Sequence, residues 1–103
     1  MKNLNKITKI ITNKSLLDLD AENKELWLRA KIVLQFIYLR ESKGYTQEEA
    51  AKRMGVIRQQ VTRFENMTNS PTITFLVKYA TALDTTIDVV LKGVELVELS
   101  NKK

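Results

Sequence analysis

Residues that break helices are few in this chain, and their positions divide it into helix-length segments. Glycine occurs three times, at positions 44, 55 and 93, and proline once, at position 71. Each lies where the spacing of apolar residues is interrupted, as expected for turns. A chain of 103 residues is long enough for one hydrophobic core and short for two. We therefore expect one mainly α domain with a short segment at each end.

Four helices are predicted by the apolar spacing between these turns. The first spans residues 22–43, and the second spans 46–54, where Thr46 and Glu49 form a capping box. The third follows the turn at position 55, and the fourth spans 72–83. The apolar face of the fourth should consist of Ile73, Leu76, Val77, Ala80 and Leu83.

The segment after the fourth helix is rich in β-branched residues. "TTIDVVL", from Thr85 to Leu91, predicts a strand. Gly93 could then turn the chain into "VELVEL". We expect a short C-terminal β-strand or hairpin, whose open edge a second copy of the chain would pair.

Apolar residues surround the first predicted helix almost completely, which implies burial on two sides. Three of them, Ile32, Phe36 and Leu39, would suffice to face the domain core. The second cover is either the preceding segment, where Leu4, Ile7 and Ile11 could form one apolar face, or another protein chain. The remaining apolar residues are Leu26, Trp27, Val33, Leu34, Ile37 and Tyr38.

The composition excludes several kinds of site. Cysteine and histidine are absent, which removes disulfides, zinc fingers, thiol nucleophiles and an imidazole base. Asp18, Asp20 and Glu22 could hold a magnesium ion, yet acidic residues are common at helix starts and no phosphate-binding loop or nucleophile lies nearby. We expect no enzymatic activity and no cofactor. Because no apolar run has the length of a membrane span, we also expect a cytoplasmic protein without membrane contact.

One short stretch has the composition of a DNA-reading surface. In "GVIRQQVTRFENM", residues 55–67, Val56, Val61 and Phe64 have the spacing of a buried helix face. An α-helix fits the major groove of DNA, where arginine pairs with guanine and glutamine with adenine. The formal net charge of +5 favours such an anionic partner. The predicted base contacts are Arg58, Gln59, Gln60 and Arg63, and the weaker phosphate candidates are Thr46, Thr62, Asn66, Thr68 and Asn69.

Two short helices joined by a glycine turn form a helix-turn-helix, and the order of residues here is more specific than that. From Leu39 to Leu83, "LRESKGYTQEEAAKRMGVIRQQVTRFENMTNSPTITFLVKYATAL" resembles the Cro and lambda-repressor-like (XRE) family. The matching features are Leu39-Arg40, Gly44 followed by Thr46-Gln47, the central Ala51, Gly55-Val56 at the turn, Glu65, and Pro71-Thr72. The resemblance implies a five-helix lambda-repressor-like domain with a long N-terminal helix and the short C-terminal strand or hairpin.

The same resemblance assigns roles to individual residues. Gln47 should contact a DNA phosphate, and Arg40 and Glu65 should pair with each other inside the protein. Three positions depart from the family pattern. Ile57 occupies the place of a capping serine or threonine, Ala50 that of a larger apolar residue, and Met67 that of a glycine.

The additions to the minimal domain resemble the HigA-type antitoxins. This implies a homodimeric repressor of a palindromic double-stranded DNA operator that also neutralises a toxin, commonly an RNA-cleaving one. The toxin contacts would come from Trp27, Leu34 and Tyr38. The alternative is a phage or mobile-element regulator without a toxin. The expected divisions are an N-terminal segment that is flexible or binds a partner (1–20), the helix-turn-helix domain (21–84) and the C-terminal strand and tail (85–103).

Overall fold

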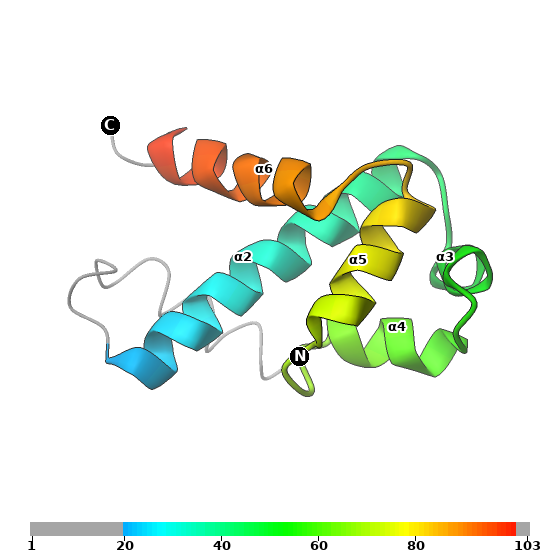
Figure 1. Cartoon of the computed structure of the whole chain (residues 1–103), viewed down its shortest axis with the longest axis horizontal. Helices are drawn as coiled ribbons and strands as arrows, with labels where there is room; N and C mark the ends of the chain where they lie inside the picture. Colours follow the sequence, from blue (N-terminus) through cyan, green and yellow to red (C-terminus); the bar gives the residue numbers. More distant parts are fainter. Residues whose placement is uncertain (1–19, 101–103) are drawn as a thin grey trace.

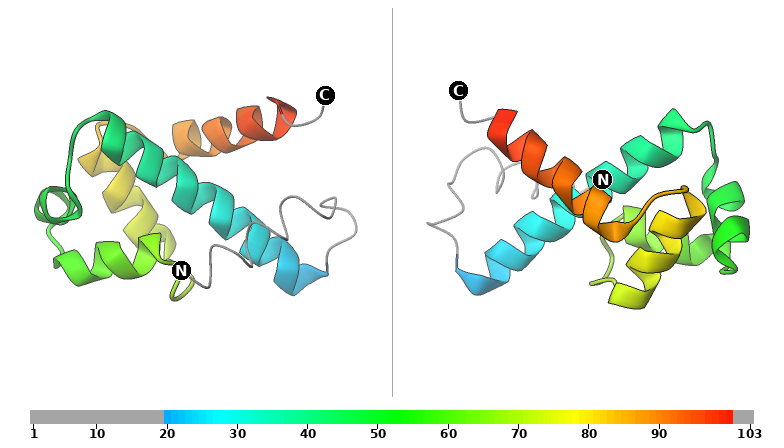
Figure 2. Two further views of the ribbon diagram at one scale, coloured as in Figure 1. Left: turned by 180° about the vertical axis from the view of Figure 1, so that it is seen from behind. Right: turned by 45° about the horizontal axis from the view of Figure 1, so that its top comes forward.

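The computed structural model describes the backbone of residues 20–100 and the side chains of residues 20–94. Within this range the chain forms five helices: α2 (Ala21–Ser42), α3 (Gln47–Met54), α4 (Arg58–Glu65), α5 (Ile73–Ala82) and α6 (Ile87–Ser100). The long helix α2 runs diagonally through the molecule, with α3, α4 and α5 gathered beside its C-terminal half and α6 on its other side (Figures 1 and 2). The predicted apolar face at Leu4, Ile7 and Ile11 lies outside the described residues.

The predicted bounds of the first, second and fourth helices agree with the structure to within one residue, and local hydrogen bonds explain them. The carboxylate of Asp20 accepts the Asn23 N–H at 2.9 Å, and the Thr72 hydroxyl accepts the Phe75 N–H at 3.0 Å. At α3 both bonds of the capping box are present, because Thr46 Oγ1 accepts the Glu49 N–H at 3.0 Å and Glu49 Oε1 accepts the Thr46 N–H at 2.9 Å. The turn before α4 is left-handed at Gly55, with φ of 74°.

Two of the three departures from the family pattern, at Ile57 and Met67, affect the ends of α4 in different ways. Ile57, at the N-cap of α4, offers no side-chain acceptor, and instead its own N–H is accepted by Gln60 Oε1 at 3.3 Å. Met67 adopts the left-handed conformation with φ of 58°, which explains why glycine is usual there. Its side chain is nevertheless buried, with 7% exposure, so packing of the side chain stabilises the unfavourable backbone conformation.

An aromatic cluster forms the centre of the core and fixes the position of α4. Phe36 of α2 stacks on Tyr79 of α5 with ring centroids 4.7 Å apart, and meets the edge of Phe64 of α4 at 5.5 Å. Small side chains at Ala50 and Ala51 are fully buried on α3, which allows α3 to pack closely against α4 and α5. The helix-turn-helix is therefore held from behind by one continuous core.

The predicted C-terminal β-strand or hairpin is wrong. Residues 87–100 form α6, and the described residues contain no strand. Val90 and Val94, four positions apart, are both buried at 0% and 7% exposure, and α6 packs against α2 and α5. A lone strand would leave its backbone groups unpaired, whereas a helix satisfies them internally. Burial of one helical face thus outweighs the β propensity of these residues.

The prediction that α2 is buried on two sides is correct in part, because Trp27 is buried whereas Leu34 and Tyr38 are 46% and 65% exposed. Phe36 and Trp27 lie nine positions apart, which at about 3.6 residues per turn places them on opposite sides of α2, and both are buried. A Cβ on Gly93 of α6 would lie only 2.4 Å from Gln35 Nε2 of α2. Helix α6 therefore supplies part of the second cover.

The predicted apolar face of α5 is correct in part. Leu76, Ala80 and Leu83 are buried as expected. Ile73 and Val77, which were expected to face the core, are 73% and 44% exposed. Tyr79 occupies the core in their place, because its ring stacks on Phe36. An exposed apolar strip one helical turn long therefore remains on α5.

Candidate nucleic-acid interface

Helix α4 presents a polar face to the outside and an apolar face to the core. Val61 and Phe64 are buried at 0% and 3% exposure. Tight packing of the turn fixes α4 against α3, since the Val56 N–H donates to the Ala51 carbonyl at 3.0 Å. The four predicted base contacts, Arg58, Gln59, Gln60 and Arg63, are all exposed.

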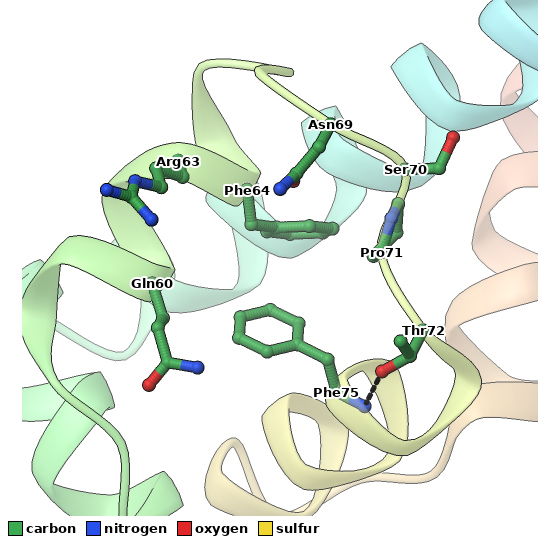
Figure 3. Close-up of a pocket in the computed structure, with 8 residues that line it drawn as sticks. All are labelled: Gln60, Arg63, Phe64, Asn69, Ser70, Pro71, Thr72 and Phe75. Carbon is green, nitrogen blue, oxygen red and sulfur yellow. Dashed lines mark hydrogen bonds between the residues drawn. The ribbon is translucent and has the colours of Figure 1, made fainter.

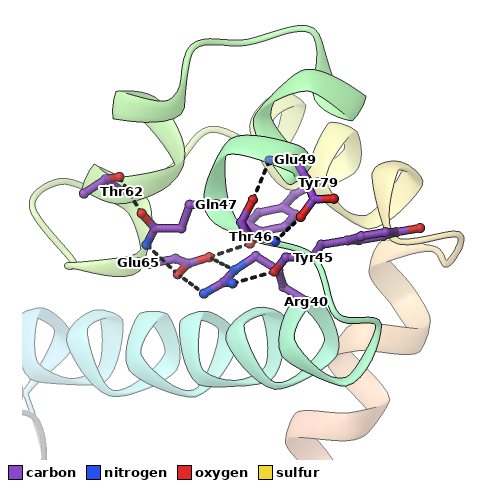
Figure 4. Close-up of polar contacts among 8 residues, drawn as sticks. All are labelled: Arg40, Tyr45, Thr46, Gln47, Glu49, Thr62, Glu65 and Tyr79. Atoms are coloured by element: carbon purple, nitrogen blue, oxygen red, sulfur yellow. Dashed lines mark hydrogen bonds and ion pairs between the residues drawn. The ribbon is translucent and has the colours of Figure 1, made fainter.

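The predicted internal pair of Arg40 and Glu65 is confirmed. Arg40 donates from Nε and Nη2 to the two carboxylate oxygens of Glu65, each at 2.9 Å, and from Nη1 to the Tyr45 carbonyl at 2.8 Å (Figure 4). Hydrogen bonding to Glu65 raises the pKa of Arg40. The buried Tyr79 hydroxyl also donates to Glu65, and burial raises the pKa of Tyr79 far above its usual value. The negative charge at the end of α4 is thereby neutralised inside the protein.

Gln47 is held between α3 and α4 by hydrogen bonds that sequence reasoning missed. Its Nε2 donates to Glu65 Oε1 at 3.0 Å, and its Oε1 accepts from Thr62 Oγ1 at 2.7 Å (Figure 4). Because Gln47 and Thr62 are 15 positions apart on different helices, no local pattern predicts this contact. With Arg40, Thr46, Glu48 and Arg58, Gln47 also lines a surface hollow of about 450 Å³ at the start of α3.

A second hollow, of about 220 Å³, opens beside the far end of α4. Phe64 and Phe75 both line it, with their ring centroids 5.3 Å apart and their planes tilted by 46° (Figure 3). Gln60 and Arg63 line one side of this hollow and the loop before α5 lines the other. Asn69, a predicted phosphate candidate, is part of that loop, while Asn66 is exposed at the C-cap of α4. The structure thus gathers residues of the turn and loop around the predicted base contacts.

The three predicted partner-binding residues lie on α2 and differ in exposure. Leu34 and Tyr38 are 46% and 65% exposed. Trp27 is 9% exposed, with Lys31 Nζ 5.8 Å from its ring centroid. The structure therefore presents two of the three residues at the surface.

The sequence also raised the possibilities of a magnesium site at Asp18, Asp20 and Glu22 and of a membrane span. Asp20 caps α2, and Asp18 lies outside the described residues. Within the described range, no group of three or more acidic side chains could hold a metal ion. No helix there has the length and apolar character needed to cross a membrane.

A family model described as helix-turn-helix matches residues 37–90, just over half of the chain. The chain belongs to this helix-turn-helix family. The match confirms the XRE-type assignment made from the sequence. The protein is accordingly a DNA-binding transcriptional regulator. Among curated proteins, no sequence matches it significantly.

Solved structures share the fold of this family member. The wild-type restriction–modification controller protein C.Esp1396I superposes with a TM-score of 0.67 at 23% sequence identity, covering 72% of this chain and 96% of that chain. A variant of that protein with tyrosine replaced by alanine gives a TM-score of 0.66 at 22% identity, covering 75% and 99%. At this level of identity the similarity concerns the fold.

Proposed function

We propose that this chain is a sequence-specific repressor that reads the major groove with Arg58, Gln59, Gln60 and Arg63. The observation that carries the proposal is the exposure of all four side chains on α4, opposite a face anchored by the aromatic core. Arginine can donate two bonds to a guanine edge and glutamine can form two with adenine, each pair contributing about 1–3 kcal/mol of discrimination. None of the described residues covers the outer face of α4.

Contacts to phosphates would orient α4 in the groove. Gln47 retains one amide hydrogen beyond the one given to Glu65, and its backbone N–H lies at the first residue of α3, where helix N–H groups favour anions. Arg58 borders the same hollow. We assign Gln47 as the principal phosphate contact and Asn66 as a weaker one.

A second copy of the chain would complete the binding unit. Helix-turn-helix proteins of this kind read half-sites about 34 Å apart as two-fold dimers. With the strand edge excluded, the support for a dimer comes from Ile73 and Val77, which form the exposed apolar strip of α5. We propose that this strip contributes to the dimer contact and that the operator is palindromic.

Gel shifts with selected duplexes and bulk competitor DNA test the proposal. Specific binding at about 0.1 M salt, falling steeply as salt rises because counterions are released, is the expected result. Arg58→Ala and Gln59→Ala should relax the preference at particular base pairs, whereas Gln47→Ala should lower the affinity for every sequence because a phosphate contact is lost. Binding no tighter than to bulk DNA would refute the proposal. Sedimentation showing a monomer on its operator would refute the dimer.

The antitoxin function is a second candidate, favoured by the exposed side chains of Leu34 and Tyr38 on α2. The C-terminal β-strand, which contributed to the resemblance to HigA-type antitoxins, is a helix in the structure. The gene next to this one separates the candidates, because a small toxic protein would favour the antitoxin and restriction or methylation genes would favour a controller like the solved relatives. A neighbour that is harmless when expressed alone would exclude the toxin partner and leave a phage-type or mobile-element regulator.

A further inference from the structure

A chain of hydrogen bonds runs from the buried ion pair to the DNA-facing helix, and each of its bonds has a defined direction. The carboxylate of Glu65 receives two N–H groups from Arg40 and the hydroxyl of Tyr79. An ionised carboxylate has no proton to donate. In the fourth hydrogen bond of this carboxylate Gln47 must therefore be the donor, and its Nε2 lies 3.0 Å from Oε1 of Glu65.

This bond fixes which way the amide of Gln47 points. The reverse orientation would set the amide oxygen against a carboxylate oxygen, two acceptors in contact. With Nε2 directed at Glu65, Oε1 faces Thr62, whose Oγ1 lies 2.7 Å away (Figure 4). A carbonyl oxygen only accepts. The single hydroxyl proton of Thr62 therefore points at Gln47.

The consequence concerns what Thr62 can offer to DNA. A free threonine hydroxyl both donates and accepts, and so pairs with any base. Here the proton is engaged, and only lone pairs of Oγ1 remain. Thr62 lies one helical turn beyond Arg58 on the same stripe of α4 and is half-buried, so its outer side borders the predicted base contacts.

We propose that Thr62 determines specificity as a hydrogen-bond acceptor, selecting a base with an exocyclic amino group, adenine or cytosine, in the major groove. Glu65 and Gln47 are positioning residues, because they set the direction of the Thr62 hydroxyl without touching the base. Thymine and guanine present keto oxygens at the corresponding place, which an acceptor cannot bind. The inference rests on the proposed function and adds to it the chemical class of one recognised base.

Selection of duplexes from a random pool by the full chain tests the proposal. For the wild type we expect one base pair in each half-site to be restricted to adenine or cytosine on the strand facing Thr62. Thr62→Ser keeps the hydroxyl and should keep the restriction, whereas Thr62→Val should lose it. Gln47→Ala releases the hydroxyl proton and should admit thymine and guanine at that position. Gln59→Ala, the matched control, should change a different base pair.

A base analogue provides the second measurement. Purine in place of adenine, or 2-pyrimidinone in place of cytosine, lacks the amino group and should weaken wild-type and Thr62→Ser binding about fivefold, as expected for loss of one hydrogen bond. Thr62→Val should bind both duplexes equally, which controls for altered base pairing. Thermal melts establish that each variant is folded.

The outcomes separate this inference from the proposed function. Enrichment of thymine or guanine at the position that Thr62→Val alters would overturn the acceptor role. Unchanged selections by both Thr62→Val and Gln47→Ala would overturn it too, while leaving specific DNA binding intact. If the wild type enriches no sequence at all, the proposed function fails and the inference fails with it.

Discussion

Arg40 and Glu65 join the last turn of α2 to the last residue of α4 through a bidentate ion pair with two 2.9 Å bonds. Both residues are buried, with 9% and 7% exposure. The pair therefore ties the end of α2 to the end of α4. It also leaves each charge dependent on the other, because neither can be solvated once its partner is removed.

Arg40→Ala should lower the free energy of unfolding by about 3–5 kcal/mol, because it leaves a buried carboxylate uncompensated. Replacing both residues, as in Arg40→Met with Glu65→Met, should cost less than Arg40→Ala alone, since no buried charge remains. Urea denaturation followed by circular dichroism measures both. If Arg40→Ala lowers the free energy of unfolding by less than about 1 kcal/mol, the pair contributes no more than an exposed salt bridge does.

Gly93 tests the helical assignment of residues 87–100. Glycine in a helix interior costs about 1 kcal/mol relative to alanine, but a Cβ there meets the side chain of Gln35. Gly93→Ala should therefore stabilise the protein by about 1 kcal/mol in a Gln35→Ala background, and by less when Gln35 must move aside. Thermal melts of the four proteins form a double-mutant cycle. Equal effects in both backgrounds would show that the two helices do not meet at this point.

Met67 combines an unfavourable backbone with a buried side chain. Met67→Ala and Met67→Gly should both destabilise, because each removes a buried side chain at a typical cost of about 2–5 kcal/mol. The glycine variant should be the more stable of the two by about 1 kcal/mol, since it relieves the left-handed conformation. The comparison needs only the difference between two urea midpoints. The reverse order would indicate that φ at this position is not positive in solution.

Acid should weaken the start of α3. Hydrogen bonding to the backbone of Thr46 lowers the pKa of Glu49 below its usual 4.5. A carboxyl whose pKa is depressed by folding stabilises the protein above its unfolded pKa, and this contribution is lost as the pH falls through the folded value. Glu49→Gln keeps an acceptor without a titrating group. Its melting temperature should fall less than that of the wild type between pH 6 and pH 3, and parallel curves would contradict the assignment.

Substitutions at Trp27 and Tyr38 distinguish a core residue of α2 from a residue that binds a partner. Trp27→Ala removes a buried ring and should cost about 3–5 kcal/mol of stability, so folding and DNA binding should weaken together. Tyr38 is 65% exposed, and Tyr38→Ala should leave both nearly unchanged. If the neighbouring gene encodes a toxin, co-expression should show that Tyr38→Ala impairs neutralisation. Full rescue by Tyr38→Ala would place the toxin contact elsewhere.

Local patterns in the sequence were sufficient to predict the starts of α2, α3 and α5 and the turn of the helix-turn-helix. The caps at Asp20, Thr46 and Thr72 and the turn at Gly55 depend on residues within a few positions of one another, so composition and spacing specify them directly. The exposed face of α4 follows from the same periodicity, because the buried residues Val61 and Phe64 determine which side remains outside.

Contacts between distant residues decided the rest. Residues 87–100 contain β-branched side chains that favour a strand locally, and only packing of Val90 and Val94 in the core, with the close approach of Gly93 to Gln35, makes them a helix. The apolar residues of α5 do not reveal that Tyr79 enters the core while Ile73 and Val77 stay outside, since that depends on how the ring meets Phe36. The link from Glu65 through Gln47 to Thr62 likewise joins three turns on two helices. Propensity acts along the chain, whereas burial and hydrogen-bond direction depend on which helices the fold brings together.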